Sequence, residues 1–339
     1  MHEAFVTDQE ILRNELQVLL GELAIDPTEP LGVDMTCLLS APGKLLSSSV
    51  ISSRIPQGFW ALLPLTIARY CVPTADRRLV HRIGLACEFL HSALDCFDEI
   101  EDDDTSEQRT LLDDGRFLNT ATFLYTLVSL VLESLFPRSL TSEQLHSLQR
   151  LLTTEVMLAM QGQHRDILAE RADLATFSPE ECLHIVSAKS GVLFRLVCRI
   201  AAHAVNANNE LVNCFAEVGE LMGIVAQLEN DVHDLEKELA SQDKQNEPSQ
   251  KSDLRRGKKT LPIVLAHKQL MSLQNAESDE QREQAHIQMT AYDQAIKATL
   301  GAAAHLRERA LLLVPRIEQM RGEVMPDSLR LLLNLTTTY

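Results

Sequence analysis

The chain has little positive charge relative to its negative charge, and few aromatic residues. Its 339 residues include 31 lysines and arginines against 48 aspartates and glutamates, and aromatic residues make up 4%. The formal net charge of −17 argues against a protein that binds the nucleic-acid phosphate backbone. The acids suit a protein that gathers carboxylates around divalent cations, although most of them are expected to be solvated surface.

Secretion and membrane signals are also missing. The first twelve residues, MHEAFVTDQEIL, carry early acids and no apolar core, unlike a signal peptide. No apolar run reaches the roughly 18 to 20 residues that span a bilayer, and residues 121–132 are predicted to form a core helix. The seven cysteines form no CxxC pair, so we expect buried free thiols. Together these features predict a cytoplasmic protein with no stable membrane insertion.

Period-two strands and internal repeats are absent, whereas apolar residues recur every three or four positions. The pattern predicts an all-α protein, a single domain over residues 1–339 with short connections. Residues 274–285 are polar and are predicted to form a loop. The predicted helices cover residues 10–23, 60–72, 80–97, 118–135, 142–160, 179–204, 210–238, 261–273 and 291–313.

One polar segment, residues 241–251 (SQDKQNEPSQK), has no apolar anchor and precedes the basic run RRGKK at 255–259. It is either a plain surface loop or a mobile lid, about residues 239–258, that becomes ordered around a ligand. The basic run favours the lid.

An apolar helical stretch turns abruptly acidic at residues 95–104. Because helical residues advance by about 100°, Asp98 and Asp102 share one face, with Asp95 near the same stripe. Such a cluster is either solvated or holds cations, and Mg²⁺ prefers these oxygen ligands. Taken alone, the cluster is better explained as a solvated helix end.

A second oxygen-rich face strengthens the metal interpretation. Asn230, Asp234 and Glu238 are spaced four apart, so their side chains can chelate one hard cation together. A charged surface helix is the alternative explanation. With the basic run nearby in sequence, the two faces suggest two sides of one metal–diphosphate cleft.

Five motifs, in order over roughly residues 40–266, resemble those of the trans-prenyl diphosphate synthases and their terpene-synthase relatives. The resemblance implies an isoprenoid-synthase helical bundle around a central active-site cavity. It also implies a homodimer that acts on an allylic prenyl diphosphate with Mg²⁺. The motifs are His91 with Asp98-Glu99-x-x-Asp102, Gly162-Gln163-x-x-Asp166, Lys189-Ser190-Gly191, Gln227-x-x-Asn230-Asp231-x-x-Asp234, and Asp253-x-x-x-Gly257-Lys258-x-Thr260-Leu261-Pro262.

The same resemblance implies roles for individual residues. The expected ligands of three Mg²⁺ ions are Asp98, Asp102, Asn230, Asp231, Asp234 and Glu238. The expected catalytic residues are Asp98, Asp102, Lys189 and Lys258. The expected substrate-binding residues are Lys189, Gln227, Arg255, Arg256, Lys258, Trp60, Phe59, Ala93, Phe97, Gln163 and Phe194. For any single aromatic residue, ordinary core packing is the simpler explanation. The small Ala93 favours a C20 substrate over a C15 substrate.

The chain departs from the chain-elongating synthases at their GGKRLRP motif, which holds isopentenyl diphosphate. In the matching stretch, residues 58–64, the lysine and both arginines are replaced by Trp60, Ala61 and Leu63. An alternative placement at residues 42–44 keeps Lys44 but also lacks the arginines. A buried diphosphate without counter-charges would be prohibitively unfavourable. Of the arginine pair expected after the first acidic motif, only Arg109 stands nearby.

The apparent loss of one diphosphate site predicts a class I terpene synthase, which ionises the substrate, releases diphosphate and yields a hydrocarbon or alcohol. The stretch around Asn230 is also similar to the NSE metal motif of those enzymes, with Asp234 replacing its Ser or Thr. One alternative is a prenyltransferase that acts on a peptide or another non-isopentenyl acceptor. The others are a chain-elongating synthase and a non-catalytic partner subunit, although the retained metal ligands argue against the last.

Overall fold

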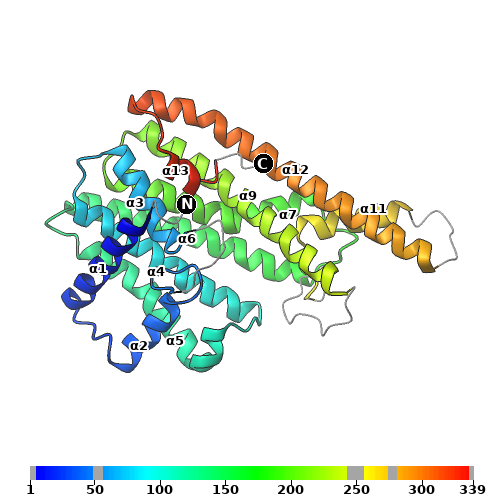
Figure 1. Ribbon diagram of the computed structural model, residues 1–339, viewed down its shortest axis with the longest axis horizontal. Coiled ribbons are helices and arrows are strands. Elements are labelled where there is room, and N and C mark those ends of the chain that lie inside the picture. Colours follow the sequence, from blue (N-terminus) through cyan, green and yellow to red (C-terminus); the bar gives the residue numbers. More distant parts are fainter. Residues whose placement is uncertain (1–4, 49–55, 243–255, 274–280, 336–339) are drawn as a thin grey trace. The chain divides into compact units, whose positions relative to one another are not determined.

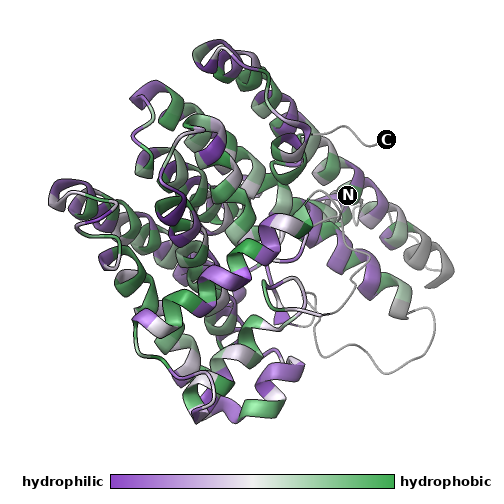
Figure 2. Ribbon diagram, turned by 60° about the vertical axis from the view of Figure 1, so that its left-hand side comes forward, coloured by the Kyte–Doolittle hydropathy of each residue, from purple (hydrophilic) through white to green (hydrophobic). Residues whose placement is uncertain are grey.

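The computed structural model describes residues 5–48, 56–242, 256–273 and 281–335. Every regular element within these ranges is a helix (Figure 1). Most helices carry polar residues on one side and apolar residues on the other (Figure 2). The all-α prediction is therefore confirmed.

The chain forms two compact units. Unit 1 comprises Met1–Thr154, Leu196–Ala216 and Val314–Tyr339, and unit 2 comprises Glu155–Arg195 and Glu217–Leu313. The single domain over residues 1–339 stays a prediction.

Helix α4 is the central element of unit 1, because it packs against α1, α3 and α5. Its residues 79–93 are buried without interruption, and most of them are apolar or small. The α2 helix packs on α5, and α13 packs on α3. The helices of this unit are α1 (Val6–Glu22), α2 (Pro30–Leu39), α3 (Phe59–Cys71), α4 (Arg77–Glu101), α5 (Glu107–Glu133) and α13 (Asp327–Leu332).

Unit 2 holds α7 (Pro179–Val186), a π-helix η2 (Ser187–Gly191) and α11 (Leu261–Leu273). Ser178 begins α7 with a capping box to Glu181, as the local sequence predicts. Four longer helices contribute residues to both units: α6 (Ser142–Glu170), α8 (Val192–Ala204), α9 (Asn209–Gln242) and α12 (Gln281–Arg321).

The predicted helices exist, but several boundaries differ. The short helices α2 and α13 were not expected, and η2 interrupts the helix predicted over residues 179–204. Residues 281–285 belong to α12, so the loop prediction for that part was wrong. Helix α9 continues to Gln242, and the rest of the predicted lid to residue 255, including Arg255, lies outside the described residues.

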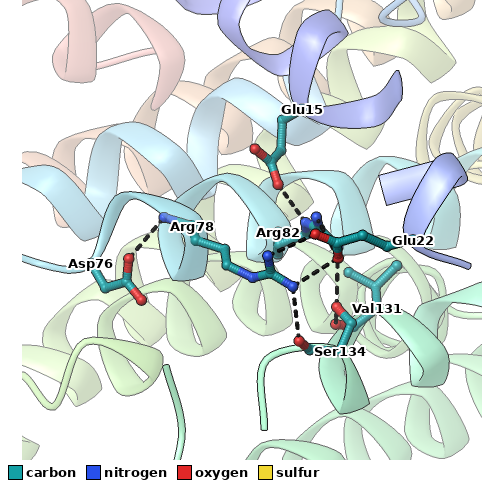
Figure 3. Close-up of polar contacts among 7 residues, drawn as sticks. All are labelled: Glu15, Glu22, Asp76, Arg78, Arg82, Val131 and Ser134. Carbon is teal, nitrogen blue, oxygen red and sulfur yellow. Dashed lines mark hydrogen bonds and ion pairs between the residues drawn. The ribbon is translucent and has the colours of Figure 1, made fainter. Parts of the chain in front are cut away.

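A fully buried arginine ties α4 to its neighbours (Figure 3). Arg82 donates to Glu15 at 2.5 Å, to Glu22 at 3.1 Å and to Ser134 Oγ at 3.2 Å. Arg78 adds two bonds of 2.8 Å to Glu22, and these lower the pKa of that carboxyl. The network joins α4 to two turns of α1, through Glu15 and Glu22, and to the end of α5, so it fixes where α4 lies in unit 1.

Two helices, α5 and α9, are long and apolar enough to cross a membrane by length and composition alone. Their apolar windows are 44% and 67% buried in the structure, and core helices of soluble proteins pass the same test. Within residues 121–132, the buried side chains are Ala121, Leu124, Leu127, Val128, Val131 and Leu132. The core-helix prediction for this stretch is therefore confirmed.

All seven cysteines are free, and six of them are buried. Burial raises the pKa of the Cys87 thiol to about 12. The prediction of unpaired thiols is confirmed.

Candidate active site

One face of α4 carries an ordered row of polar side chains. Glu88, His91, Asp95, Asp98 and Asp102 follow at steps of three and four residues, so they lie within an arc of about 80°. Glu88 and His91 are 0% and 3% exposed, whereas the Asp95 side chain is 59% exposed. The row therefore runs from a buried end, past the exposed Asp95, to an acidic end where Asp98 is half-buried and Asp102 is 7% exposed.

The acidic end coincides with the C-terminus of α4, where the helix dipole already disfavours negative charge. The last turn of the helix contains no basic residue. Arg109 offsets part of this charge, because it donates to the carbonyl oxygens of Glu99 and Asp104 and pairs with Asp114 at 2.7 Å. The Glu99 carboxylate accepts a bond from the Ser106 N–H at 2.6 Å and closes the turn. Asp98 and Asp102 thus stand at a helix end that favours a cation.

Lys44 lies beside the same row. Gly58 donates its N–H to the Gly43 carbonyl at 2.8 Å, so the two sequence stretches proposed for the basic motif are adjacent. The Lys44 ammonium pairs with the Asp95 carboxylate. Burial works to lower the pKa of Lys44, but the carboxylates of Asp95 and Glu88 outweigh burial and raise it. The one lysine of these stretches is therefore already held by a carboxylate of this chain.

Trp60 stacks on His91, with ring centroids 3.3 Å apart and planes 4° apart. Phe59 contacts Trp60 edge-on at 4.9 Å. Burial lowers the pKa of His91 to about 3, so its imidazole is neutral at physiological pH. A neutral aromatic stack thus occupies the neighbourhood where a chain-elongating synthase needs arginines.

In unit 2, the Lys189 segment is a π-helix enclosed by two glycines. A Cβ on Gly162 of α6 would come within 2.4 Å of the Ala188 carbonyl carbon. A Cβ on Gly223 of α9 would come within 2.6 Å of the Ser190 carbonyl oxygen. Backbone therefore meets backbone on both sides of η2, which explains the glycine in the GQxxD segment.

This packing places Lys189 and Gln227 in defined contacts. Lys189 Nζ donates to the Asp166 carboxylate at 3.2 Å. Ser190 Oγ donates to Gln227 Oε1 at 2.8 Å, and Gln227 Nε2 donates to Asp231 Oδ1 at 2.8 Å. Asp231, which is 4% exposed, belongs to this internal chain of bonds.

The exposed face of α9 carries the other predicted ligands. Asn230 Nδ2 donates to Asp234 Oδ2 at 3.1 Å, and Lys237 lies 3.6 Å from the other Asp234 oxygen. The bond from Nδ2 leaves the amide oxygen of Asn230 facing elsewhere as an acceptor. Asn230, Asp234 and Glu238 share a helix face, whereas Asp231 lies in the buried chain.

The segment that follows the lid is anchored to the end of α6. Lys259 donates to the Glu170 carbonyl at 3.0 Å, and Arg256 lies 3.5 Å from the Glu170 carboxylate. Cys182 donates through its thiol to the Lys259 carbonyl. Arg256 and Lys258 therefore lie next to a segment that is anchored to α6.

The remaining predicted residues lie within the packed helices. Phe97 contacts Tyr125 at 6.4 Å, and Ala93 is fully buried in α4. Phe194 lies against Gly223, and Gln163 follows Gly162 on α6.

Among the described residues, no three His, Cys, Asp or Glu side chains lie close enough to hold a metal by themselves. Mg²⁺ commonly takes only one or two carboxylates, with water and substrate phosphate completing its shell. The donor sets at Asp98 and Asp102, and on α9, fit that mode.

Sequence reasoning missed the Lys44–Asp95 pair, the Trp60–His91 stack and the Asp166 contact of Lys189. A lone lysine after a glycine carries no signal of its partner 51 residues away. The GQxxD segment did contain Asp166, but its contact depends on the π-helix, which no periodicity predicts.

The chain belongs to the polyprenyl synthetase family, whose profile matches residues 59–300. It is 32% identical, over 57% of its length, to the tryptophan prenyltransferase ComQ of Bacillus spizizenii, and spans 61% of that protein. A polyprenyl synthetase from Streptomyces coelicolor A3(2) has the same fold, with TM-score 0.67 and 19% identity over 98% of this chain and 99% of that one.

A polyprenyl synthase from Caulobacter crescentus CB15, solved with calcium and isoprenyl diphosphate, is also similar in fold. Its TM-score is 0.64 at 17% identity, over 96% of each chain. These likenesses confirm the isoprenoid-synthase resemblance and the fold.

Gly162→Ala is expected to destabilise unit 2 by about 1–3 kcal/mol, because the new methyl group overpacks against backbone atoms that cannot rotate away. Gly301→Ala is the matched control, since a Cβ there meets nothing within 4 Å and alanine favours a helix. Urea unfolding of both variants checks this. Equal stability of the two variants would contradict the close packing around η2.

His91→Gln is expected to change the pH dependence of stability. Because the folded pKa is about 3 and the unfolded value near 6.5, the unfolded state binds a proton first as the pH falls. Stability present above pH 6.5 is therefore lost on acidification, by up to about 1.4 kcal/mol per pH unit between about pH 6 and 4. The variant should lack this contribution in urea unfolding at a series of pH values. Parallel curves for wild type and variant would refute it.

Proposed function

We propose that this chain ionises an allylic prenyl diphosphate with Mg²⁺ and delivers the prenyl group to something other than isopentenyl diphosphate. The main observation behind this proposal is that neutral and already paired side chains stand where a second anion site would be needed. Trp60 is stacked on a neutral His91, and the Lys44 charge is paired with Asp95. A second diphosphate there would lack the unpaired cations that its burial requires.

In this proposal some residues bind Mg²⁺ and others bind the diphosphate. Asp98 and Asp102, and on α9 Asn230, Asp234 and Glu238, would hold the Mg²⁺ ions, three in the family resemblance. Bound Mg²⁺ supplies positive charge that stabilises the departing diphosphate. Lys189 and Lys258 would grip the same anion, with Arg256 and Arg255 in support. Such preorganised charges are the main source of rate acceleration in an enzymatic ionisation.

Asp166 positions Lys189 before substrate arrives, through the 3.2 Å contact between them. The aromatic side chains Phe59, Trp60, Phe97 and Phe194 would face the allylic cation, because ring faces attract positive charge. Closure of the lid would exclude bulk water. The C20 preference argued from Ala93, a homodimer and a cytoplasmic location remain proposals.

The allylic cation can have two fates under this proposal. Transfer to an acceptor is favoured by the identity to a tryptophan prenyltransferase and by the buried polar end of the α4 row. The class I terpene synthase predicted from the sequence is favoured by the Asn230–Asp234–Glu238 face, which resembles an NSE motif. Both dispense with isopentenyl diphosphate.

The deciding experiment incubates purified protein with Mg²⁺ and farnesyl or geranylgeranyl diphosphate, with and without isopentenyl diphosphate, and in each case with and without N-acetyl-L-tryptophanamide as an acceptor. We expect diphosphate release that isopentenyl diphosphate does not stimulate, and no longer prenyl alcohol after phosphatase treatment. Gas chromatography–mass spectrometry then shows any terpene hydrocarbon or alcohol. Chain extension that requires isopentenyl diphosphate would overturn the proposal.

Asp98→Asn and Asp102→Asn are each expected to lower the rate of diphosphate release by about 100-fold or more, because each removes a carboxylate that would hold the Mg²⁺ stabilising the departing diphosphate. Asp103→Asn is the control, since its side chain is 97% exposed and lies one position beyond Asp102. It should keep the wild-type rate within about twofold. A similar loss in all three variants would show that only net charge matters.

A further inference from the structure

One side of α9 carries four residues that follow at steps of three and four positions and therefore share a face. They are Glu220, Gly223, Gln227 and Asp231. Gly223 and Gln227 both lie against Ser190 of η2, and Asp231 accepts a hydrogen bond from Gln227. Glu220 is the member of this row that none of the five sequence motifs includes, so its role has to be inferred from its contacts.

Glu220 contacts both ends of the π-helix. Its Oε1 accepts a hydrogen bond of 3.3 Å from Ser187 Oγ, and Ser187 is the first residue of η2. A Cβ on Gly191, the last residue of η2, would lie 3.4 Å from Glu220 Cγ, so the stem of Glu220 lies against that end. Lys189 is the middle residue of the five. Glu220 therefore spans the segment that carries Lys189.

The carboxylate of Glu220 is itself held by Arg195 of α8. Arg195 Nη1 donates to Glu220 Oε2 at 2.9 Å, and its Nε and Nη2 donate to Glu155 Oε2 at 3.0 and 2.7 Å. Glu155 is 3% exposed. Burial works to lower the pKa of Arg195, but the hydrogen bonds to the two carboxylates outweigh burial and raise it. Because charge-assisted hydrogen bonds are the strong ones, the Glu220 carboxylate has a fixed place beside Ser187.

We propose that Glu220 is a positioning residue, which clamps η2 at both ends and thereby aims Lys189 at the departing diphosphate. The inference rests on the proposed function, in which Lys189 grips that anion. Short π-helical segments are rare and frequently mark functional sites. A charge that stabilises a leaving group must be held where the transition state needs it, and a misplacement of about 1 Å can cost about 100-fold in rate. Glu220 acts through Lys189 and does not itself touch the substrate.

Glu220→Leu removes the carboxylate and is assayed with Mg²⁺ and farnesyl or geranylgeranyl diphosphate. We expect kcat for diphosphate release to fall by about 10-fold or more and KM to change by less than about threefold, because an aimed charge matters most in the transition state. Glu220→Gln should recover part of kcat, since its amide can bond both Ser187 and Arg195. Glu217→Leu, at an exposed position one turn earlier on α9, is the matched control and should keep kcat within about twofold.

A double-mutant cycle with Lys189→Met separates positioning from general support of the fold. If Glu220 acts through Lys189, then adding Glu220→Leu to Lys189→Met should change kcat by less than about twofold. A residue that only supports the fold would lower kcat by the same factor in both backgrounds. That result would overturn the inference and leave the proposed function intact.

Calorimetric titration with Mg²⁺ and inorganic pyrophosphate gives a second measurement that requires no turnover. Glu220→Leu is expected to weaken pyrophosphate binding by about 10-fold in the wild-type background and by less than about twofold in Lys189→Met. Loss of a negative charge alone would instead strengthen the binding of an anion. Unchanged or tighter binding therefore overturns the positioning role.

The outcomes for wild-type protein distinguish the inference from the proposed function. Wild-type protein that neither releases diphosphate nor binds pyrophosphate overturns both. Chain extension that requires isopentenyl diphosphate overturns the proposed function alone, because the pyrophosphate titrations still decide the role of Glu220. Diphosphate release at the same kcat in wild type and Glu220→Leu overturns the inference alone.

Discussion

The buried guanidinium of Arg82 is the constraint on which unit 1 depends. A charge with no exposure is tolerated only while its partners remain in place, and removing one partner of such a pair is strongly destabilising. Because Glu15 and Glu22 lie on α1 and Ser134 follows α5, the rotation of α4 about its own axis is fixed. The polar row that runs along α4 from Glu88 to Asp102 is therefore oriented by the same contacts.

The polar row places two different electrostatic environments along one helix. Its acidic end gathers carboxylates where the helix dipole repels them, so the end is ready for cations. Its buried end has the opposite character, with a neutral imidazole and a paired lysine. The change occurs within about four turns, between Glu88 and Asp102.

The sequence predicted much of this because the relevant signals are local. Apolar periodicity located α3, α4, α5 and α9, and the steps of four between acids placed them on common faces. The cap at Ser178 predicted the start of α7 correctly. Local spacing could not reveal that Asp231 turns to Gln227 while Asn230 turns to Asp234. The rotamers and neighbouring helices decide that difference.

Trp60 is the sole tryptophan of the chain, and it lies flat against His91. Tryptophan emission from this protein therefore originates at one place, beside the α4 row. An imidazolium quenches indole emission, whereas this buried imidazole stays neutral until strongly acidic pH. The intensity and the wavelength of Trp60 fluorescence therefore report the solvation and occupancy of the surroundings of Trp60, and no added label is needed.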